Sequence, residues 1–459
     1  MKIFAKSNHS FQGGVHPGEN KHLTSEREIQ SSPAPKEVAI MLSQHTGAVC
    51  QPLVKKGDVV KAGQKIGNND AFISAPVHSP VNGKVKDITL QSHAILGRSL
   101  GILIEADSAD NPAKEPSSAK FTAEFDLAAF SPEKIRDAVR EAGIVGMGGA
   151  GFPTRVKIEP NPTMPDRTLI INGCECEPYI TCDYRVMMEW TYQVIAGVKL
   201  ARKASDCSQV IIAIEDNKPQ AIETVQSALN NSHNVTDIKV VTVKTKYPQG
   251  GERQLINAVL DKIVPTGSIP PKIGVVVLNV ATCAAIAEAV LCNWPLTHRV
   301  VTVTGEGIAK PGNFYVPIGT QVGALIEFCG GATSDTVKMV LGGPMMGIAI
   351  ADTATPINKT TGAITILTQS QIERSRIGGV ETPCIRCGRC LEACPENLMP
   401  TKIAHAVKYN LLDTAKDYFM SACIECGCCS YVCPANIELT GLIKTGKILV
   451  ARQAKRMPQ

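Results

Sequence analysis

Two cysteine runs near the end of the chain constrain its fold more than any other feature. The first run covers residues 384–395 and the second covers residues 423–434, and both have the spacing C-x2-C-x2-C-x3-C-P. Zinc sites do not use triple runs of this kind closed by Cys-Pro, and a disulfide framework has no reason to repeat the spacing. The runs therefore predict a compact domain built around iron–sulfur clusters.

The spacing also assigns the thiolates to two [4Fe–4S] clusters. Three closely spaced cysteines can hold three irons of one cubane, whereas the fourth lies too far round to close the same cube and ligates the other one. The first-run cluster is expected to use Cys384, Cys387, Cys390 and Cys433, and the second-run cluster Cys423, Cys426, Cys429 and Cys394. A ninth cysteine, Cys428, is out of register and is expected to be unligated.

Composition restricts the remaining classes. The 459 residues suggest about three domains at roughly 150 residues each, and a hydrophobic content of 44% with 19% charged residues is typical of globular proteins. Seventeen cysteines would suit a secreted chain, but eight are assigned to clusters and no apolar signal segment follows Met1, so we expect a reducing cytosol. The net charge of +5, without basic blocks interleaved with aromatics, does not indicate nucleic-acid binding.

One apolar segment, residues 273–294, has the length of a membrane span. Asn279, Thr282 and Glu288 lie inside it, and each would be costly at bilayer depth. A β-branched run followed by an alanine-rich run is more typical of a buried strand that leads into a helix. We therefore expect any membrane association to depend on partner proteins.

The first third of the chain predicts an arm and a small β domain. Residues 1–30 contain His9, His16 and His22, whose irregular spacing favours surface residues over a metal site. Residues 31–107 alternate apolar and polar residues between turns, which predicts an all-β sandwich or barrel.

Phrases in this segment resemble the barrel-sandwich hybrid of biotinyl and lipoyl domains. The hairpin at residues 67–72 lacks the lysine that a carrier needs, so we interpret the domain as scaffold. Residues 108–130 are rich in proline and serine and are expected to be a linker.

Residues 131–295 are expected to form an open α/β domain. Ser131 and Pro132 are typical of a helix N-terminus. Buried strands and an intervening helix alternate after it, which indicates a β-α-β arrangement. The expected strands are 168–171, 210–214, 238–243 and 274–279, with a helix over 219–229.

Glycine-rich and polar loops follow the predicted strands. Residues 146–153 match G-x-G-x-x-G by letter, but a helix precedes them and Phe-Pro follows, so an ordinary dinucleotide-binding fold is excluded. Closely spaced glycines still let backbone N–H groups approach a phosphate or a flat ring, and Lys157 could add charge. Further loops at 172–178, 250–252 and 279–282 suit one shared pocket at the carboxyl ends of the strands.

Alternatives remain for two groups in this region. Cys174, Cys176 and Cys182 could form a metal site, although they lack paired C-x2-C spacing. The glycine-rich segment could also be only a structural turn.

The last 164 residues predict three segments. Residues 296–370 carry short strands and a helix over 322–329, which suggests a small β-grasp module, with Met345 and Met346 filling a gap. Residues 371–440 form the two-cluster domain, with a helical pattern in its spacer. Residues 441–459 are a basic tail, expected to be a solvated helix, with contact to a partner or anionic lipid as the alternative.

The loop motifs resemble those of two related families. "GxGGAGFP", "NGxExEP", Gly-Gly-Glu and the Asn279–Thr282 segment resemble the flavin- and NADH-binding subunit of respiratory complex I. "GGVHPxENK", "YPQGGE" and "LGGPMMG" are similar to motifs of the RnfC/RsxC family, whose members belong to the Rnf complexes. The order of a barrel-sandwich hybrid, an α/β flavin domain, a β-grasp module of the SLBB type and an α-helical two-cluster ferredoxin domain, in a multidomain α+β protein, is similar too.

The resemblance implies the residues of a flavin site. By the family pattern, FMN would contact Gly146, Gly148, Lys157, Asn172, Glu175, Gly250, Asn279 and Thr282, and NADH would lie near Gly149, Glu177 and Glu252, with Gly251 in the same loop. The complex I subunit has an acid where Cys174 stands, glycine where Tyr179 stands and a second acid where Gly251 stands.

The resemblance also implies an activity. This chain would be the peripheral subunit, at the cytoplasmic face of the membrane, of an ion-translocating NAD:ferredoxin oxidoreductase, and ferredoxin would reach it through partner subunits. NADH gives two electrons as a hydride and a cubane carries one, so FMN must lie between them. The protein then positions cofactors, and no side chain need act as acid or base. Two alternatives are a soluble flavin and iron–sulfur reductase of the cobalamin-reductase type, and a non-enzymatic electron-wiring subunit.

Overall fold

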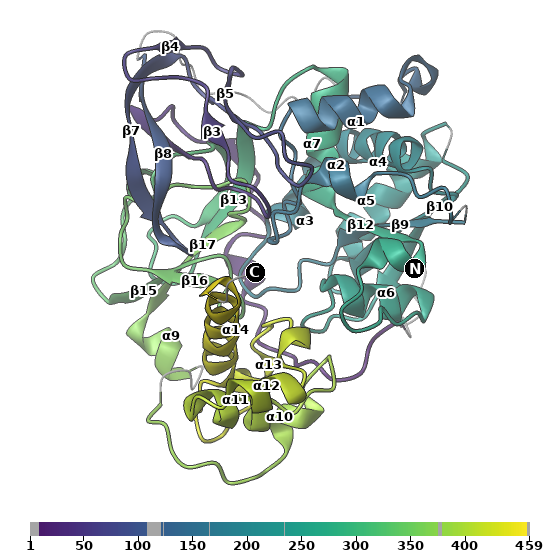
Figure 1. Cartoon of the computed structure of the whole chain (residues 1–459). Coiled ribbons are helices and arrows are strands. Elements are labelled where there is room, and N and C mark those ends of the chain that lie inside the picture. The colour runs from purple at the N-terminus through teal and green to yellow at the C-terminus, as the bar shows by residue number, and fades with distance from the viewer. Residues whose placement is uncertain are drawn as a thin grey trace.

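The computed structural model describes residues 9–107, 121–122, 124–164, 166–233, 235–374 and 379–456. Most of the expected linker over 108–130 lies outside the described residues, as do the first eight and last three residues of the chain. Four groups of elements follow one another along the chain, and Figure 1 shows the β-rich groups on one side, the α/β group opposite and the cysteine-rich helices at the lower end.

The first group is all β, as predicted. One sheet has the order β2-β8-β7-β4 and the other β3-β5-β6. Val38, Ile40, Ile66, Ile102 and Ile104 form the core between them and are fully buried. The strands are β2 (Glu37–Met41), β3 (Gln51–Pro52), β4 (Val59–Val60), β5 (Lys65–Asn68), β6 (Val77–His78), β7 (Gly83–His93) and β8 (Gly97–Ala106).

The second group is an open parallel sheet with the order β11-β10-β9-β12. Its strands are β9 (Thr168–Gly173), β10 (Gln209–Glu215), β11 (Ile238–Val243) and β12 (Val275–Asn279). Its helices are α1 (Pro132–Glu141), α2 (Thr154–Lys157), α3 (Cys182–Glu189), α4 (Thr191–Ser205), α5 (Pro219–Asn230), α6 (Glu252–Leu260) and α7 (Val280–Leu291). Because every strand in this sheet runs the same way, their carboxyl ends meet at one edge.

Local sequence signals explain how these helices begin. The Ser131 hydroxyl accepts a hydrogen bond from the Lys134 amide at 3.3 Å, so α1 begins where its cap predicts. The apolar segment from Ile273 to Trp294 forms β12 and then α7, as expected from its composition. Among the described residues, none of the helices has both the length and the apolar character that crossing a bilayer requires.

The third group is a six-stranded sheet of order β1-β14-β13-β17-β15-β16. It contains β13 (His298–Thr304), β14 (Gly312–Pro317), β15 (Thr336–Leu341), β16 (Ile348–Ile350), β17 (Ala363–Thr368) and the helices α8 (Val322–Phe328) and α9 (Gln369–Arg374). Its edge strand, β1 (Ile29–Ser31), pairs with β14 in parallel. The end of the N-terminal arm is thus part of this sheet, which local pattern could not reveal because β1 lies almost 300 residues from its partner.

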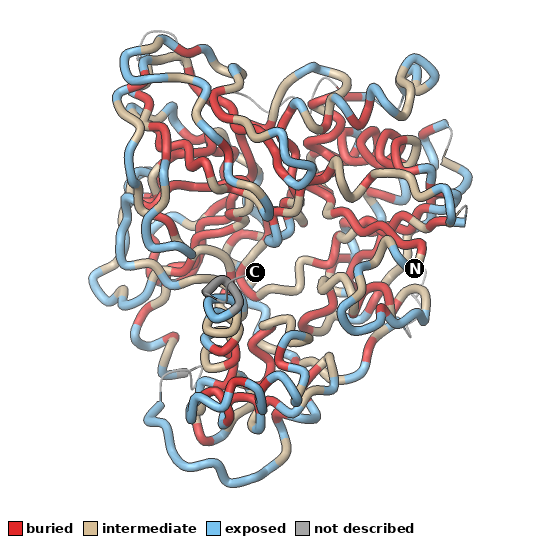
Figure 2. Tube along the Cα trace, viewed as in Figure 1, coloured by how far each residue is buried: buried red, intermediate tan, exposed pale blue. Residues whose placement is uncertain are grey.

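The fourth group is helical. It contains α10 (Arg389–Glu392), α11 (Pro400–Lys408), α12 (Leu412–Asp417), α13 (Cys428–Tyr431) and α14 (Leu439–Arg456). The helix expected in the basic tail is present, but it begins at Leu439, and Ile443 is buried against Ile403 and Val407 of α11. The start of α14 therefore belongs to the core of the cysteine-rich group, whereas Thr445, Ile448 and residues 451–453 further along the helix are exposed. Figure 2 shows buried residues at the start of the helix.

Candidate functional site

The glycine-rich loop at residues 146–153 forms a closed turn beside the carboxyl edge of the parallel sheet. The Gly146 amide donates to the Phe152 carbonyl at 2.9 Å, and the Met147 amide donates to the Thr282 hydroxyl at 3.0 Å. Gly149 has φ +122°, and a Cβ added there would meet no atom within 4 Å. The backbone at Gly149 therefore borders open space, as the cradle of a phosphate or flat ring requires.

Loops from two strand ends meet this turn. Asn172, at the end of β9, donates to the Gly250 carbonyl at 2.8 Å. Asn279, at the end of β12, caps α7 by accepting from the Ala281 amide at 2.9 Å, and a Cβ on Gly148 would stand 3.4 Å from it. The structure thus brings together the loops that were expected to share a pocket.

Lys157 and Glu252 face each other across this site. The Lys157 ammonium contacts the Glu252 carboxylate and donates to the Val277 carbonyl at 3.3 Å. The resemblance assigned Lys157 to FMN and Glu252 to NADH, and the ion pair links these two residues. The Lys157 ammonium and the open backbone of the glycine turn at Gly149 are groups of the kind that bind a flavin phosphate.

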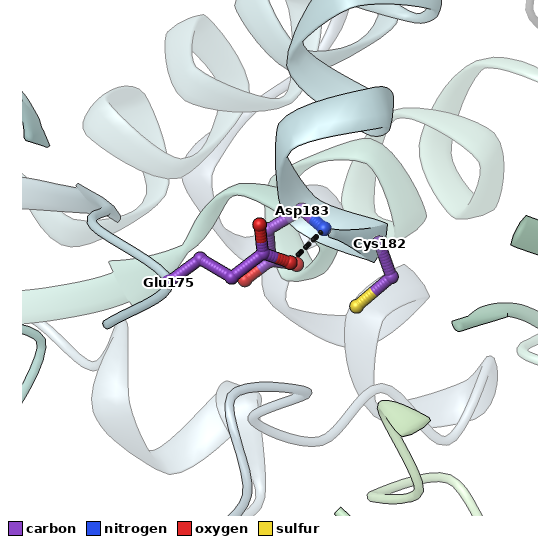
Figure 3. Close-up of side chains that lie close together, drawn as sticks. All are labelled: Glu175, Cys182 and Asp183. Atoms are coloured by element: carbon purple, nitrogen blue, oxygen red, sulfur yellow. Dashed lines mark hydrogen bonds between the residues drawn. The ribbon is translucent and has the colours of Figure 1, made fainter. Parts of the chain in front are cut away.

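The carboxylate of Glu175 caps α3. It accepts from the Asp183 amide at 2.6 Å and from the Tyr184 amide at 3.1 Å (Figure 3). Burial raises the pKa of Glu175 to about 7. Among the described residues, one group lies close enough together to hold a metal ion, namely Glu175, Cys182 and Asp183. The Glu175 carboxylate, however, already accepts hydrogen bonds from free backbone amides at the start of α3.

The alternative metal trio is not assembled. Cys174 lies with its sulfur 3.9 Å from the Ala213 carbonyl, and the Cys176 sulfur accepts from the Gly250 amide at 3.3 Å. Neither belongs to the group around Cys182 within the described part of the chain. These two thiols instead contact backbone groups of Ala213 and Gly250 beside the loop at residues 172–178.

Glu177 is held by the "LGGPMMG" loop between β15 and β16. Its carboxylate accepts from the Met346 amide at 2.7 Å and from the Met345 amide at 3.2 Å. Burial raises the pKa of Glu177 to about 7. The expectation for Met345 and Met346 concerned their side chains, whereas the contact seen here is made by their backbone amides, which bind an acid that the resemblance placed near NADH.

Lys21 of the arm is a residue that sequence reasoning missed. Its ammonium donates to three carbonyls of the loop after β9, those of Glu175 at 2.8 Å, Glu177 at 3.0 Å and Ile180 at 2.5 Å. Glu175 and Tyr179 have left-handed backbones in this loop. The only signal in the sequence was the place of Lys21 in the "GGVHPxENK" motif.

The second-run cysteines line one cavity with Cys394 of the first run. Cys394, Cys423, Cys426 and Cys429 all contribute to its wall, together with the ninth cysteine, Cys428. The Leu398 amide donates to the Cys394 sulfur at 3.3 Å and the Glu425 amide to the Cys423 sulfur at 3.4 Å. The four thiols assigned to the second-run cluster, one of them from the first run, thus lie around one space, as crossed ligation would require. That these four cysteines are the ligands stays a prediction.

The first run has the same local backbone. Arg386 and Glu425 are both left-handed, with φ 58° and 60°, and the glycines that follow, Gly388 and Gly427, have φ 78° and 83°. The Arg386 amide donates to the Cys384 sulfur at 3.4 Å, as Glu425 does to Cys423. The exposure differs at the first two positions, since Cys384 and Cys387 are exposed whereas their counterparts Cys423 and Cys426 are half-buried and buried. The third cysteines, Cys390 and Cys429, are both buried.

The second-run cavity adjoins the α/β and β-grasp groups. The Tyr247 hydroxyl donates to the Cys426 carbonyl at 2.7 Å, and a Cβ on Gly427 would stand 2.8 Å from the Met345 carbonyl oxygen. Glu396 accepts from Gln254 at 2.7 Å. Cys428 is buried here with its sulfur 3.9 Å from the Tyr247 carbonyl, so it faces this interface.

Four family profiles match the chain in the expected order. They are the RnfC barrel sandwich hybrid domain at residues 9–109, the Nuo51 FMN-binding domain at 139–288, the SLBB domain at 300–349 and a 4Fe-4S dicluster domain at 383–437. These matches confirm the expected fold classes and the expectation of FMN and [4Fe–4S] cofactors.

A solved structure shows the same fold. The chain resembles the NAD+-reducing [NiFe]-hydrogenase in its H2-reduced state with a TM-score of 0.51 at 20% identity, covering 75% of this chain and 70% of that one.

Curated relatives match most of the chain. It is 42% identical over 89% of its length to the C component of the proton-translocating ferredoxin:NAD(+) oxidoreductase complex of Clostridium ljungdahlii, covering 87% of that protein. The C component of the Na(+)-translocating complex of Acetobacterium woodii is 39% identical over 88% of each chain. The C component of the Rhodobacter capsulatus ion-translocating oxidoreductase complex is 39% identical over 86% of this chain and 74% of its own. The chain therefore belongs to the RnfC family, whose members are components of ion-translocating oxidoreductase complexes.

Proposed function

We propose that this chain is the NAD(H)-reacting subunit of a membrane-bound, ion-translocating ferredoxin:NAD+ oxidoreductase. The supporting observation is the direct contact between the candidate flavin loops and the second-run cavity, through Tyr247 and Cys426. When bound, FMN would exchange a hydride with NAD(H) and single electrons with the clusters. Two electrons and one proton leave each NADH, so two one-electron carriers are reduced per NADH.

The residues of the chain would bind and orient. The backbone around Gly149 and the Lys157 ammonium would hold the flavin phosphate, and Glu252, paired with Lys157, would lie beside the nicotinamide end. Glu177 would be fixed in place by the amides of Met345 and Met346. Glu175 would act through α3, because its carboxylate is engaged by that helix.

The geometry also supports an order for the two clusters. The Cys394, Cys423, Cys426 and Cys429 site lies against the flavin domain, whereas Cys384 and Cys387 are exposed. We infer that electrons pass between flavin and partner by way of the second-run cluster first. We further propose that the subunit lies at the cytoplasmic face of the membrane, held there by the other subunits of the complex.

The test is anaerobic reconstitution of the full chain with FMN, iron and sulfide, followed by NADH addition. Bleaching of the flavin band supports the proposal, and stable flavin absorbance with excess NADH contradicts it. Gly148→Val should weaken FMN binding, because its side chain would fill space beside Asn279, with the Cβ 3.4 Å from that residue, where the family resemblance places FMN. Gly18→Val is the control, since Gly18 is exposed, is not among the glycines with positive φ, and a Cβ there would have only the Asn20 side-chain nitrogen within 4 Å, at 3.6 Å.

A further inference from the structure

The two cluster-binding halves are built alike but covered differently. Their shared backbone, left-handed at Arg386 and Glu425 and again at Asn397 and Asn436, makes them internal copies of one another. Any difference in the surfaces of equivalent positions therefore reflects the surroundings of each copy rather than its construction.

The second half is covered by the chain itself. Tyr247 and Met345 both reach it, since the Tyr247 hydroxyl donates to the Cys426 carbonyl at 2.7 Å and a Cβ on Gly427 would stand 2.8 Å from the Met345 carbonyl oxygen. The N-terminal arm contacts the first half at the end of its run, where a Cβ on Gly13 would stand 2.8 Å from the Cys394 carbonyl oxygen. The charged side chain of the second half, Glu425, also has a partner, because it forms an ion pair with Lys447 at 2.5 Å.

The first half presents an apolar surface to solvent. Every residue from 379 to 387 is exposed, and this segment runs along the lower rim of the molecule in pale blue (Figure 2). Val380 is 85% exposed, Ile385 68% and Leu391 40%. Such a group of large apolar side chains beside two cysteine ligands is unusual for a surface that meets only water.

This surface is also basic. Arg386 occupies the position of Glu425, and Arg389 occupies the position of buried Cys428. Within the described part of the chain no ion pair engages either arginine. The acids nearby are Glu381, which pairs with Lys408 at 3.1 Å, and Glu392. Two unpaired arginines around an apolar centre are complementary to a partner with acidic rim residues.

We propose that the face formed by Val380, Ile385, Arg386, Arg389 and Leu391 is the docking surface for an acidic iron–sulfur protein or domain that carries one electron at a time. The proposal rests on the proposed function, because it takes the first-run cluster as the end of the chain's electron path. Redox partners use small interfaces, which bury less than about 1,200 Å² in total. The arginines steer the acidic partner, and the apolar residues exclude water beside Cys384 and Cys387.

Binding to a defined probe tests this surface without relying on turnover. The probe is an oxidised, acidic two-cluster ferredoxin, titrated calorimetrically against the reconstituted full chain at low and at high ionic strength. We expect affinity to fall with salt. Arg386→Glu with Arg389→Glu should weaken binding at low salt by at least about tenfold and remove most of the salt dependence. Folding should survive, because Glu425 shows that glutamate is accepted at the same left-handed position.

Lys55→Glu with Lys61→Glu is the matched control. It makes the same charge change at exposed positions flanking β4, at the opposite end of the molecule from α10 (Figure 1). A basic cytochrome c serves as the second probe, and its binding should strengthen in the Arg386/Arg389 variant. Absence of ferredoxin binding, salt-independent binding, or equal losses in both double variants would overturn the docking surface.

Failure of this proposal is distinguishable from failure of the proposed function. Each sample is first tested for NADH-dependent bleaching of the flavin. Flavin bleaching without ferredoxin binding contradicts only the docking surface. Absence of bleaching in the unaltered protein contradicts the proposed function, and the binding titration then still decides whether the surface binds ferredoxin.

Discussion

Single residues decide how the two cluster sites share their ligands. The spacing of each run predicts that its fourth cysteine ligates the other cluster, and Cys394 lines the cavity of the second run. The reason is geometric, since three thiols in a tight loop occupy one side of a cube and Cys-Pro carries the fourth away from it.

Reciprocal cysteine variants test this exchange. Cys433→Ser should disturb the first-run cluster and spare the second-run cluster, and Cys394→Ser should do the reverse. The reason is that each cysteine is predicted to ligate the cluster of the run to which it does not belong. Iron content with electron paramagnetic resonance of the reduced protein separates the two signals. Loss of only the second-run cluster in Cys433→Ser would show that the assignment is reversed.

Lys21 is the second residue whose removal should have a local effect. Lys21→Met leaves the carbonyls of Glu175, Glu177 and Ile180 without their donor, and each buried unsatisfied group costs about 1–3 kcal/mol. We expect a lower free energy of unfolding and weaker FMN binding, measured by denaturant titration and by flavin fluorescence. Lys36→Met, at an exposed position on the barrel side, is the control and should change neither quantity. Equal FMN affinity in Lys21→Met and the unaltered chain would refute the positioning role.

At the scale of elements, one loop of the β-grasp group connects two other groups. The "LGGPMMG" loop grips Glu177 with its amides and contacts Gly427 with the Met345 carbonyl, so one β-grasp loop touches both the flavin domain and the cluster domain. Gly427 and its counterpart Gly388 have the same backbone conformation, which makes them a natural pair for comparison.

Gly427→Ala should destabilise the protein more than Gly388→Ala. Both place a Cβ on a left-handed backbone, which costs roughly 1–2 kcal/mol. Only the Cβ at 427 meets another group, the Met345 carbonyl oxygen at 2.8 Å, whereas the Cβ at 388 meets nothing within 4 Å. Thermal melts should show the larger fall in Tm for Gly427→Ala, with faster proteolysis between the β-grasp and cluster domains. Equal shifts in Tm would mean that the loop contact contributes nothing.

At the scale of the whole molecule, Lys359 joins three groups. Its ammonium donates to the Pro76 carbonyl of the barrel at 2.6 Å and to the Gly143 carbonyl after α1 at 2.7 Å, and its own amide donates to Gln44 at 3.0 Å. Burial lowers the pKa of Lys359 to about 7 from 10.5.

This lowered pKa predicts a pH dependence of stability. Between about pH 7 and 10.5 the unfolded chain keeps the Lys359 proton and the folded chain has lost it, so the free energy of unfolding rises with pH by up to about 1.4 kcal/mol per unit. Lys359→Met should remove that contribution. The difference between the two proteins in free energy of unfolding at pH 7, 8 and 9 measures it, and exposed Lys338→Met should show a constant difference. A constant difference for Lys359→Met as well would contradict the buried, weakly basic amine.

Much of this protein was determined by sequence alone, because its signals are local. Cysteine spacing, the Ser131 cap, the β-branched strands and the glycine turn depend on neighbours a few residues away, and the elements formed where those signals predicted. Only tertiary structure decided the rest. The pairing of β1 with β14, the contacts of Lys21 with the flavin loop and the contact of Tyr247 with the second cysteine run join residues separated by tens to hundreds of positions. Spacing within a run cannot encode which half of a repeated motif the remainder of the chain will bury.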